Sequence, residues 1–210
     1  MKLKYHGHAC FSMRFECGAK IVCDPFDPTV TFAPCTEECD AAILSHDHFD
    51  HNYTASLSGN FETIASAGER IVSGAKIRSI PCFHDKEGGA LRGRNLVSII
   101  ECEGLKIAHL GDLGHMPDES MMAQLSGIDV MLLPIGGTYT IDTEEAEELI
   151  RAAKPRIAVA MHFKTGAYEI KITTCEAFKK DMMAANMPNE IEITEGNISK
   201  LPPVIIMDYK

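Results

Sequence analysis

The sequence predicts a single α/β (α+β) domain in which β-sheets are covered by helices. Three observations lead to this fold class. The first half of the chain is a series of short strand-like segments joined by turns, whereas the second half alternates buried strands with helices. The chain has 210 residues, a length that suits one domain, and it contains no internal repeat, low-complexity tract or linker. We therefore expect one domain over residues 1–210.

Apolar and β-branched runs define the strands of the first half. A three-stranded meander is expected from Lys2–Tyr5, Cys10–Glu16 and Lys20–Cys23, with Gly18 in its second turn. Asp24-Pro25 and Asp27-Pro28 then break regular structure, and a loop is expected up to Glu38. Further strands are predicted at Ala41–Ser45, Phe61–Ser66, Lys76–Pro81, Leu96–Glu103 and Lys106–Leu110. The glycine-rich sequence HDKEGGALRGRN, between two of these strands, predicts a mobile loop.

Helical periodicity appears in the second half. Asp142 and Glu145 have the spacing of a capping box, and the apolar residues that follow, up to Ala153, fall on one helical face before Pro155. Two more helices are predicted at Pro117–Leu125 and Thr174–Ala185. Strands are predicted at Asp129–Pro134, Ile157–Met161, Ile191–Thr194 and Val204–Met207.

Composition and charge restrict the function. Hydrophobic residues make up 45% of the chain and charged residues 24%, which is typical of a soluble globular protein. The formal net charge of −10 argues against a broad nucleic-acid-binding surface. No signal-peptide h-region or membrane-length apolar run is visible, so we expect a cytoplasmic protein without membrane association. The 8 cysteines are scattered and lack a C-x-x-C pair, so reduced thiols are expected, and Cys35 with Cys39 is only a weak redox or metal pair.

The sequence LSHDHFDH is the main indication of chemistry. It places His46, His48, Asp50 and His51 in an H-x-H-x-D-H pattern, for which the chance expectation in a chain of this composition is about 0.001. Imidazole nitrogens and carboxylate oxygens are ligands of zinc and of other divalent metals. A loop that leaves the buried strand Ala41–Ser45 can direct His46 and His48 to one ion and Asp50 and His51 to a neighbouring one.

Four ligands for two ions leave each ion incompletely coordinated, so further ligands should follow. His84, Asp112 and His162 each come directly after an apolar, strand-like run. Functional groups gather at such positions when several strand ends meet at one edge of a sheet. The sequence therefore predicts that these residues complete a metal site.

The sequences YHGHACFSM…IVCDPF, SHDHFDH, AHLGD and PIGGTYTIDTEEAEELI…KPRIAVAMHFKT together resemble the metallo-β-lactamase superfamily. The resemblance extends over nearly the whole chain and is greatest to a branch of metal-dependent hydrolases that includes ascorbate-6-phosphate lactonase-like proteins. It implies a four-layer αββα sandwich, with mixed sheets inside, helices outside and a dinuclear site at one edge. Ser45 departs from the threonine that often precedes the motif.

The resemblance also implies a ligand for each ion. His46, His48 and His84 would hold the first metal, Asp50, His51 and His162 the second, and Asp112 would bridge them. Two divalent ions about 3.5–4 Å apart can share a water and lower its pKa toward 7. The resulting hydroxide would attack a carbonyl carbon or a phosphorus, with Asp50 orienting it and moving a proton. Zinc is the expected metal, with manganese and iron as alternatives.

Several other residues are candidates for supporting roles. His109 and His115 flank Asp112 and are rival ligands, and a supporting role behind the ligands is the alternative for His109. His8, in a glycine turn, is a candidate for such a supporting role, with an ordinary turn histidine as the alternative. Tyr139 is a candidate donor to a substrate oxygen, with packing as the alternative. Three cations could attract an anionic group on the substrate, with solvated surface charge as the alternative: Arg92, Arg94 and Lys164.

These observations predict a hydrolase of small-molecule esters, lactones or phosphoesters, acting on a small and potentially anionic substrate. A phosphodiesterase or nuclease of the same fold is one alternative, and a non-catalytic metal-binding regulatory protein is another. A redox enzyme is disfavoured because the di-iron members of the fold carry Glu where this chain has His48. A homo-oligomer is compatible with the sequence, which names neither substrate nor partner.

Overall fold

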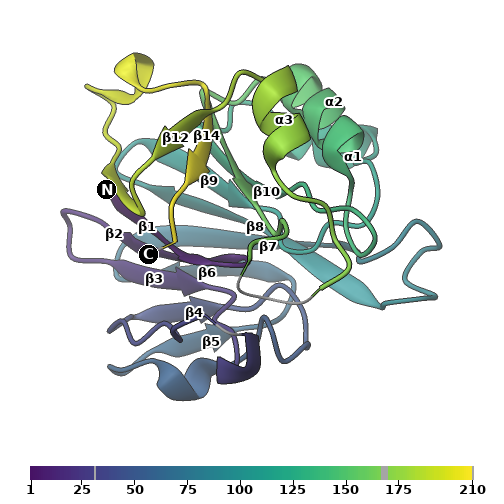
Figure 1. Ribbon diagram of the computed structural model, residues 1–210. Helices are drawn as coiled ribbons and strands as arrows, with labels where there is room; N and C mark the ends of the chain where they lie inside the picture. Colours follow the sequence, from purple (N-terminus) through teal and green to yellow (C-terminus); the bar gives the residue numbers. More distant parts are fainter. Residues whose placement is uncertain (31, 167–169, 210) are drawn as a thin grey trace.

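Two mixed β-sheets form the centre of the molecule in the computed structural model, which describes residues 1–30, 32–166 and 170–209 (Figure 1). One sheet has six strands in the order β13-β1-β2-β3-β4-β5. The other has eight strands in the order β12-β14-β11-β10-β9-β8-β7-β6. Because β3 to β5 run parallel to one another, as do β9 to β11, their carboxyl ends meet at common edges.

The strand bounds agree with most of the predicted segments. The strands of the six-stranded sheet are β1 Lys2–Gly7, β2 Cys10–Arg14, β3 Lys20–Cys23, β4 Ala41–Ile43, β5 Glu62–Ile64 and β13 Glu190–Glu192. Those of the eight-stranded sheet are β6 Gly68–Val72, β7 Ala75–Phe83, β8 Arg94–Cys102, β9 Leu105–His109, β10 Val130–Pro134, β11 Ile157–Met161, β12 Ala185–Met187 and β14 Val204–Met207.

The main core lies between the two sheets. Alternate residues of each strand point inward, so that Leu3 and Tyr5 of β1 face the same core as Ile100 of β8 and Leu132 of β10, and all four are buried. Burial of apolar area of this extent is the dominant favourable contribution to folding. The sequence periodicity of two therefore translates directly into the inner faces of the sandwich.

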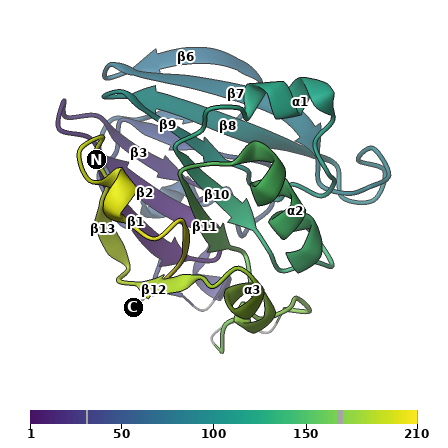
Figure 2. The ribbon, with the colours of Figure 1, turned by 90° about the horizontal axis from the view of Figure 1, so that it is seen from above.

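Helices cover the outer face of the eight-stranded sheet (Figure 2). They are α1 Glu119–Gln124, α2 Thr143–Ala153 and α3 Glu176–Asp181. The α2 helix begins with the predicted capping box, in which the Asp142 side chain accepts the Glu145 N–H and the Glu145 side chain accepts the Asp142 N–H. Leu149 and Ile150 then pack against the outer side chains of the sheet.

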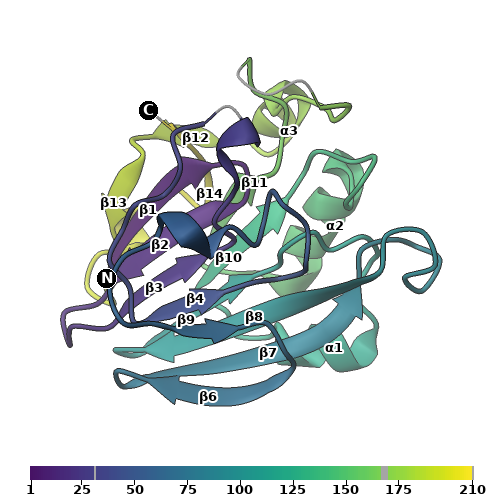
Figure 3. The ribbon, with the colours of Figure 1, turned by 90° about the horizontal axis from the view of Figure 1, so that it is seen from below.

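The outer face of the six-stranded sheet has a different cover. Within the described residues it is covered by the segment between β3 and β4, which includes the 3₁₀ helix Pro28–Val30 (Figure 3). Phe26, Val30 and Phe32 from this segment pack on Cys10 and Val22 of the sheet. The predicted α/β fold class, two mixed sheets inside a sandwich, is confirmed.

One predicted helix was wrong in extent, and the strands β6 and β12 were not predicted. The helix predicted at Thr174–Ala185 spans only Glu176–Asp181, because Met183 takes a left-handed conformation (φ 51°) and turns the chain into β12. The hairpin strand β6 was not predicted because it is an edge strand without a buried face, and therefore lacks alternating apolar residues.

None of the helices in the described part of the chain is long and apolar enough to cross a membrane. The eight cysteines, all of which are described, form no disulfide.

Candidate metal centre

The H-x-H-x-D-H loop begins three residues after the end of β4 and is anchored by Asp24. This aspartate directly follows β3, is completely buried and takes a left-handed conformation (φ 45°). Its carboxylate accepts the Ser45 N–H at 2.7 Å and the Ser45 hydroxyl at 2.6 Å. The same carboxylate lies 2.8 Å from Nδ1 of His51. Asp24 therefore connects both ends of the loop. The sequence does not reveal this role, because the proline after Asp24 favours a turn.

Hydrogen bonds at Nδ1 determine which nitrogen three of the histidines present. His46 Nδ1 lies 2.9 Å from the Ser45 hydroxyl, which already donates to Asp24 and therefore accepts from His46. His51 Nδ1 faces Asp24, and His84 Nδ1 lies 2.9 Å from the Tyr139 carbonyl oxygen, which can only accept. In each ring Nδ1 is the donor, so Nε2 is left to face the site.

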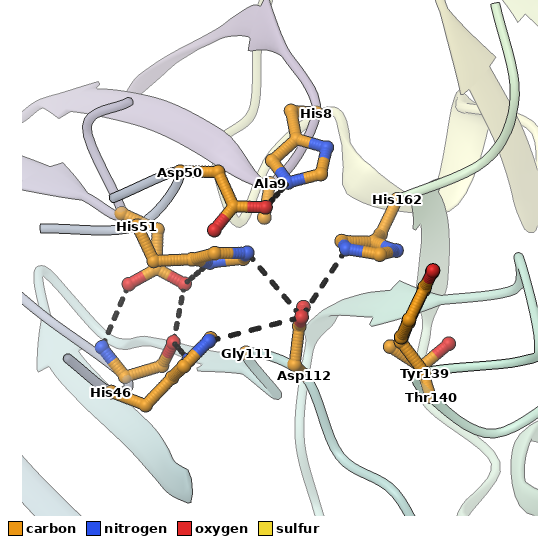
Figure 4. A network of polar contacts seen from close by, with 12 residues as sticks. His8, Ala9, His46, Asp50, His51, Gly111, Asp112, Tyr139, Thr140 and His162 are labelled. Atoms are coloured by element: carbon orange, nitrogen blue, oxygen red, sulfur yellow. Dashed lines mark hydrogen bonds and ion pairs between the residues drawn. The ribbon is translucent and has the colours of Figure 1, made fainter. Parts of the chain in front are cut away.

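Four Nε2 atoms converge on one oxygen of Asp112, which is buried. Figure 4 shows three of these histidines, His46, His51 and His162, around Asp112. The Asp112 Oδ2 atom lies 3.2 Å from Nε2 of both His84 and His162, 3.3 Å from His51 and 3.9 Å from His46. Gly111, directly before it, has a φ of 54°, and a Cβ there would lie 2.4 Å from the Ser45 Cβ. Only glycine therefore lets the strand end of β9 approach the ligand loop so closely.

His162 connects the two sheets at the opposite side of the site. It follows β11, has a φ of 51°, and its backbone N–H donates to the His8 carbonyl at 2.8 Å. The His8 ring packs between the rings of His51 and His162, with centroid distances of 4.9 and 4.3 Å. The His8 Nε2 atom lies 3.2 Å from Asp50 Oδ2. The turn between β1 and β2 thus contacts ligands on both sides.

Charges within the cluster are strongly coupled. Burial, reinforced by the neighbouring His51, lowers the pKa of His46 to about 3. Burial also lowers the pKa of His51, but the carboxylates of Asp112 and Asp24 outweigh it and hold the pKa well above its usual value. Burial raises the pKa of Asp112, but the facing His162 and His51 dominate and keep it well below its usual value. The two carboxylates thus favour a proton on His51, with which a metal ion has to compete for Nε2.

The cluster contains buried polar atoms that the protein leaves without a hydrogen bond. These atoms are His46 Nε2, His51 Nε2, His162 Nδ1 and Asp112 Oδ1. Unsatisfied buried polar atoms are costly, and four in one cluster need a common explanation. Imidazole nitrogens and carboxylate oxygens are metal ligands, so the donor set fits divalent cations.

The donor atoms divide into groups that could each hold an ion. His46, His48 and His84 place one ligand atom each within 4.8 Å of one another, as expected for the first metal. His51 and His162 form a second group, together with His8. Asp50, predicted in that second set, directs one oxygen to His8 instead and lines the adjacent cavity. A third group of His46, His51 and Asp112 joins the two.

His109 and His115 are not among the groups of metal donors found in the described residues. The buried ring of His109 places Nε2 2.8 Å from the Ala9 carbonyl and accepts the Gly111 N–H at Nδ1. His109 therefore supports the glycine before Asp112. His115 accepts the Phe83 N–H at Nε2 and supports the turn that carries His84.

Asn95 is a further supporting residue that sequence analysis missed. It is completely buried. Its Oδ1 accepts the Asp112 N–H at 3.0 Å, and its Nδ2 donates to the Leu110 carbonyl at 2.9 Å. Asn95 thus fixes the backbone of the central ligand, and its place at the start of a strand gave no signal in the sequence.

A cavity of about 620 Å³ opens over the ligands. It is lined by His48, Phe49, Asp50, His84, Arg92, Asp112, Tyr139, His162, Ile170 and Lys171. Among the predicted substrate contacts, Arg92 and Tyr139 line the cavity, whereas Arg94 and Lys164 do not. Lys171, Phe49 and Ile170 were not singled out from the sequence, because a surface cation and isolated apolar residues are common on any protein.

Comparisons with known proteins agree with this arrangement. A family model described as the β-lactamase superfamily domain matches residues 2–162. A UPF0173 metal-dependent hydrolase of Thermococcus kodakarensis is 31% identical over 193 residues, which cover 79% of this chain and 85% of that protein.

Solved structures give the same result for the fold. A proposed Zn-dependent hydrolase of the metallo-β-lactamase superfamily from Thermotoga maritima superposes with a TM-score of 0.83 at 34% identity, covering 98% of this chain and 97% of that one. An isothiocyanate hydrolase from gut bacteria of Delia radicum superposes with a TM-score of 0.67 at 15% identity, covering 100% and 97% of the two chains. The second likeness concerns the fold alone.

Proposed function

From the premise that this chain belongs to the β-lactamase superfamily and is a metal-dependent hydrolase, we propose that it uses two divalent ions, by preference zinc, to hydrolyse a small-molecule ester, lactone or phosphoester. The observation that carries the proposal is the convergence of four imidazole Nε2 atoms on Asp112 Oδ2, with buried donor atoms left unpaired. Such a donor set is far better suited to cations than to a metal-free core.

The histidine ligands that we propose follow from the two donor groups, and Asp50 is added as the superfamily resemblance implies. His46, His48 and His84 would hold one ion, and His51 and His162 the other together with Asp50, with Asp112 between the two ions. When bound, divalent ions lower the pKa of water and stabilise the negative charge that develops on an attacked carbonyl or phosphoryl group. The Nδ1 contacts described above would hold the rings in the orientation that this requires.

Asp50 is the proposed proton acceptor. Burial raises its pKa, but the hydrogen bond from His8 and the charges of His51 and His8 together outweigh burial, and the pKa lies below its usual value. Its Oδ2 faces His8, so Oδ1 can hold a water molecule in the cavity and take its proton. Tyr139, which lines the same cavity, would donate its hydroxyl proton to a substrate oxygen.

Metal content per chain, measured by elemental analysis on protein purified without chelator or added metal, tests the proposal. We expect about two equivalents of zinc, manganese or iron, and hydrolysis in a screen of lactones, esters and phosphodiesters. One equivalent would indicate a weakly held second ion, which titration would reveal. Protein that contains no metal and takes up none would contradict the proposal.

His48→Ala is the matched variant for this test. His48 is exposed in the loop, so its loss should change the free energy of unfolding by no more than about 0.5 kcal/mol. We expect metal content and hydrolysis to fall together while the circular dichroism spectrum stays unchanged. Asp47→Ala, at the exposed position next to it, is the control and should retain both. Full metal content in His48→Ala would disprove the ligand assignment.

A further inference from the structure

The loop between β7 and β8, residues 84–93, is folded around the buried carboxylate of Asp85. Its Oδ1 accepts the N–H groups of Glu87 and Gly89, each at 2.8 Å. Its Oδ2 accepts those of Leu91 at 3.0 Å and Arg92 at 2.7 Å. The glycine-rich sequence that predicted a mobile loop is therefore held at four backbone positions by one side chain, and the backbone of Arg92 is one of them.

Arg92 extends from this loop over the aromatic ring of Tyr139, with 5.1 Å between its guanidinium carbon and the ring centroid. Both side chains line the cavity over the ligands. Four other arginines each form an ion pair with a glutamate, namely Arg14, Arg70, Arg151 and Arg156. Within the described residues, the structure records no ion pair for Arg92. A guanidinium that stacks on a ring at a cavity wall retains its hydrogen-bond donors for a ligand.

The charge of the cavity also favours an anion, an argument that rests on the proposed function. Two divalent ions carry four positive charges, and the only carboxylates that line the described cavity, Asp50 and Asp112, supply two negative ones. Arg92 and Lys171 add positive charge at the wall. The rest of the chain is acidic, with a formal net charge of −10, and would repel an extended polyanion such as a nucleic acid. A small anion is the ligand that satisfies both conditions.

The cavity also has an apolar side. Phe49, 54% exposed in the ligand loop, and Ile170 line it together with the metal ligands. An exposed phenylalanine at the mouth of a polar site is suited to contact an apolar part of a substrate. A substrate that matches this cavity would have three parts, a scissile bond at the metal ligands, an apolar portion at Phe49 and an anionic group at Arg92.

We infer that Arg92, seated on Tyr139 and positioned by the Asp85-folded loop, is a substrate-binding residue for an oxyanion, a phosphate or a carboxylate, that the substrate carries apart from the cleaved bond. Arginine binds either oxyanion through two parallel N–H···O hydrogen bonds. Specificity would then depend on Arg92, whereas the chemistry depends on the metal ligands.

Titration of metal-loaded protein with inorganic phosphate and with acetate, followed by calorimetry, tests this inference without turnover. We expect Arg92→Ala to weaken binding of the oxyanion by about tenfold to hundredfold, as for loss of a charge-assisted hydrogen bond. Arg92→Lys keeps the positive charge but loses the two parallel N–H donors of the guanidinium, so its affinity for the oxyanion should lie between those of the wild type and Arg92→Ala. The anion whose affinity falls less in Arg92→Ala, phosphate or acetate, is the less suitable model of the group that Arg92 binds. Arg94→Ala is the control, because Arg94 is exposed, two residues away and outside the cavity.

Equal affinities of Arg92→Ala and Arg94→Ala for both anions would overturn the inference. Metal content, measured in each variant by elemental analysis, should equal that of the wild type, so a failure of the metal site is recognised separately.

A second measurement compares p-nitrophenyl acetate with the p-nitrophenyl monoester of glutaric acid, which have the same leaving group. Arg92→Ala should raise KM only for the ester that carries the carboxylate. If the wild type hydrolyses neither ester, ester hydrolysis fails as a function, while the titration still decides the role of Arg92.

Discussion

At the scale of single residues, the site depends on side chains that hold the ligands as much as on the ligands themselves. Asp24 is the clearest example, since its carboxylate contacts Ser45 and His51 at the two ends of the ligand loop. Burial raises the pKa of Asp24, but the charges of His51 and His109 outweigh burial and lower it. Asp24 thus stays ionised and fixes the tautomer and orientation of His51.

Asp24→Asn tests this role. An amide cannot accept two hydrogen bonds from Ser45 and a third from His51 with the same strength, so His51 loses its fixed orientation. We expect metal affinity to fall by about tenfold to hundredfold, measured by competition with a chromophoric chelator. Asp27→Asn is the control, since Asp27 lies in the same segment and accepts only the Thr29 N–H among the described side-chain contacts. Unchanged affinity in Asp24→Asn would show that the loop orients its histidines without this carboxylate.

At the scale of elements, the sequence predicts the ligand-bearing strand ends well. His84, Asp112 and His162 follow β7, β9 and β11, and each of these strands can be recognised in the sequence as an apolar run. Their convergence at one edge then follows from the general behaviour of parallel strands. That each of them binds metal stays a prediction.

Other parts of the site could not be read from the sequence. Asp24 also comes directly after a strand, as His84 and His162 do, but the proline after it favours the interpretation as a turn. The contacts of His8 with Asp50 and His162 join segments that are distant in sequence, and no local pattern encodes such pairs. The loop after β7 was expected to be mobile because glycine content is visible, whereas the folding role of a single aspartate depends on backbone directions.

Asp85→Asn tests the role of that aspartate within the element. The amide keeps one acceptor oxygen, so at least two of the four backbone N–H groups lose their partner. We expect faster hydrogen exchange of residues 87–92 and weaker phosphate binding than in the wild type, with unchanged metal content. Glu87→Gln, in the same loop, serves as the control because only its backbone contacts Asp85. Wild-type exchange rates in Asp85→Asn would contradict the proposed role.

At the scale of the whole molecule, the two sheets meet at a centre whose protonation is linked to metal binding. The raised pKa of His51 means that the metal-free protein gains stability from an imidazolium between Asp24 and Asp112. This contribution is fully present below the unfolded-state pKa of about 6.5 and is lost as the pH rises through the higher folded-state pKa. A metal ion requires a free Nε2 lone pair and therefore displaces this proton.

We accordingly expect metal affinity to increase as the pH is raised from about 6 to about 8, with release of a proton on binding. Calorimetric titrations in two buffers of different ionisation enthalpy measure the number of protons released. His51→Gln, which cannot carry the charge, provides the comparison and should release fewer protons. An affinity that is independent of pH would show that His51 is already neutral in the metal-free protein.

The contact between the His8 carbonyl and the His162 N–H has a consequence for folding kinetics. A chain cannot complete the centre until β11 has docked on the first two strands, so a metal ion meets the full ligand set only in the docked arrangement. A metal ion that binds only this completed arrangement stabilises the native state without stabilising the folding transition state. Metal loading should therefore prolong the lifetime of the native protein by slowing unfolding, and leave the rate of folding unaltered.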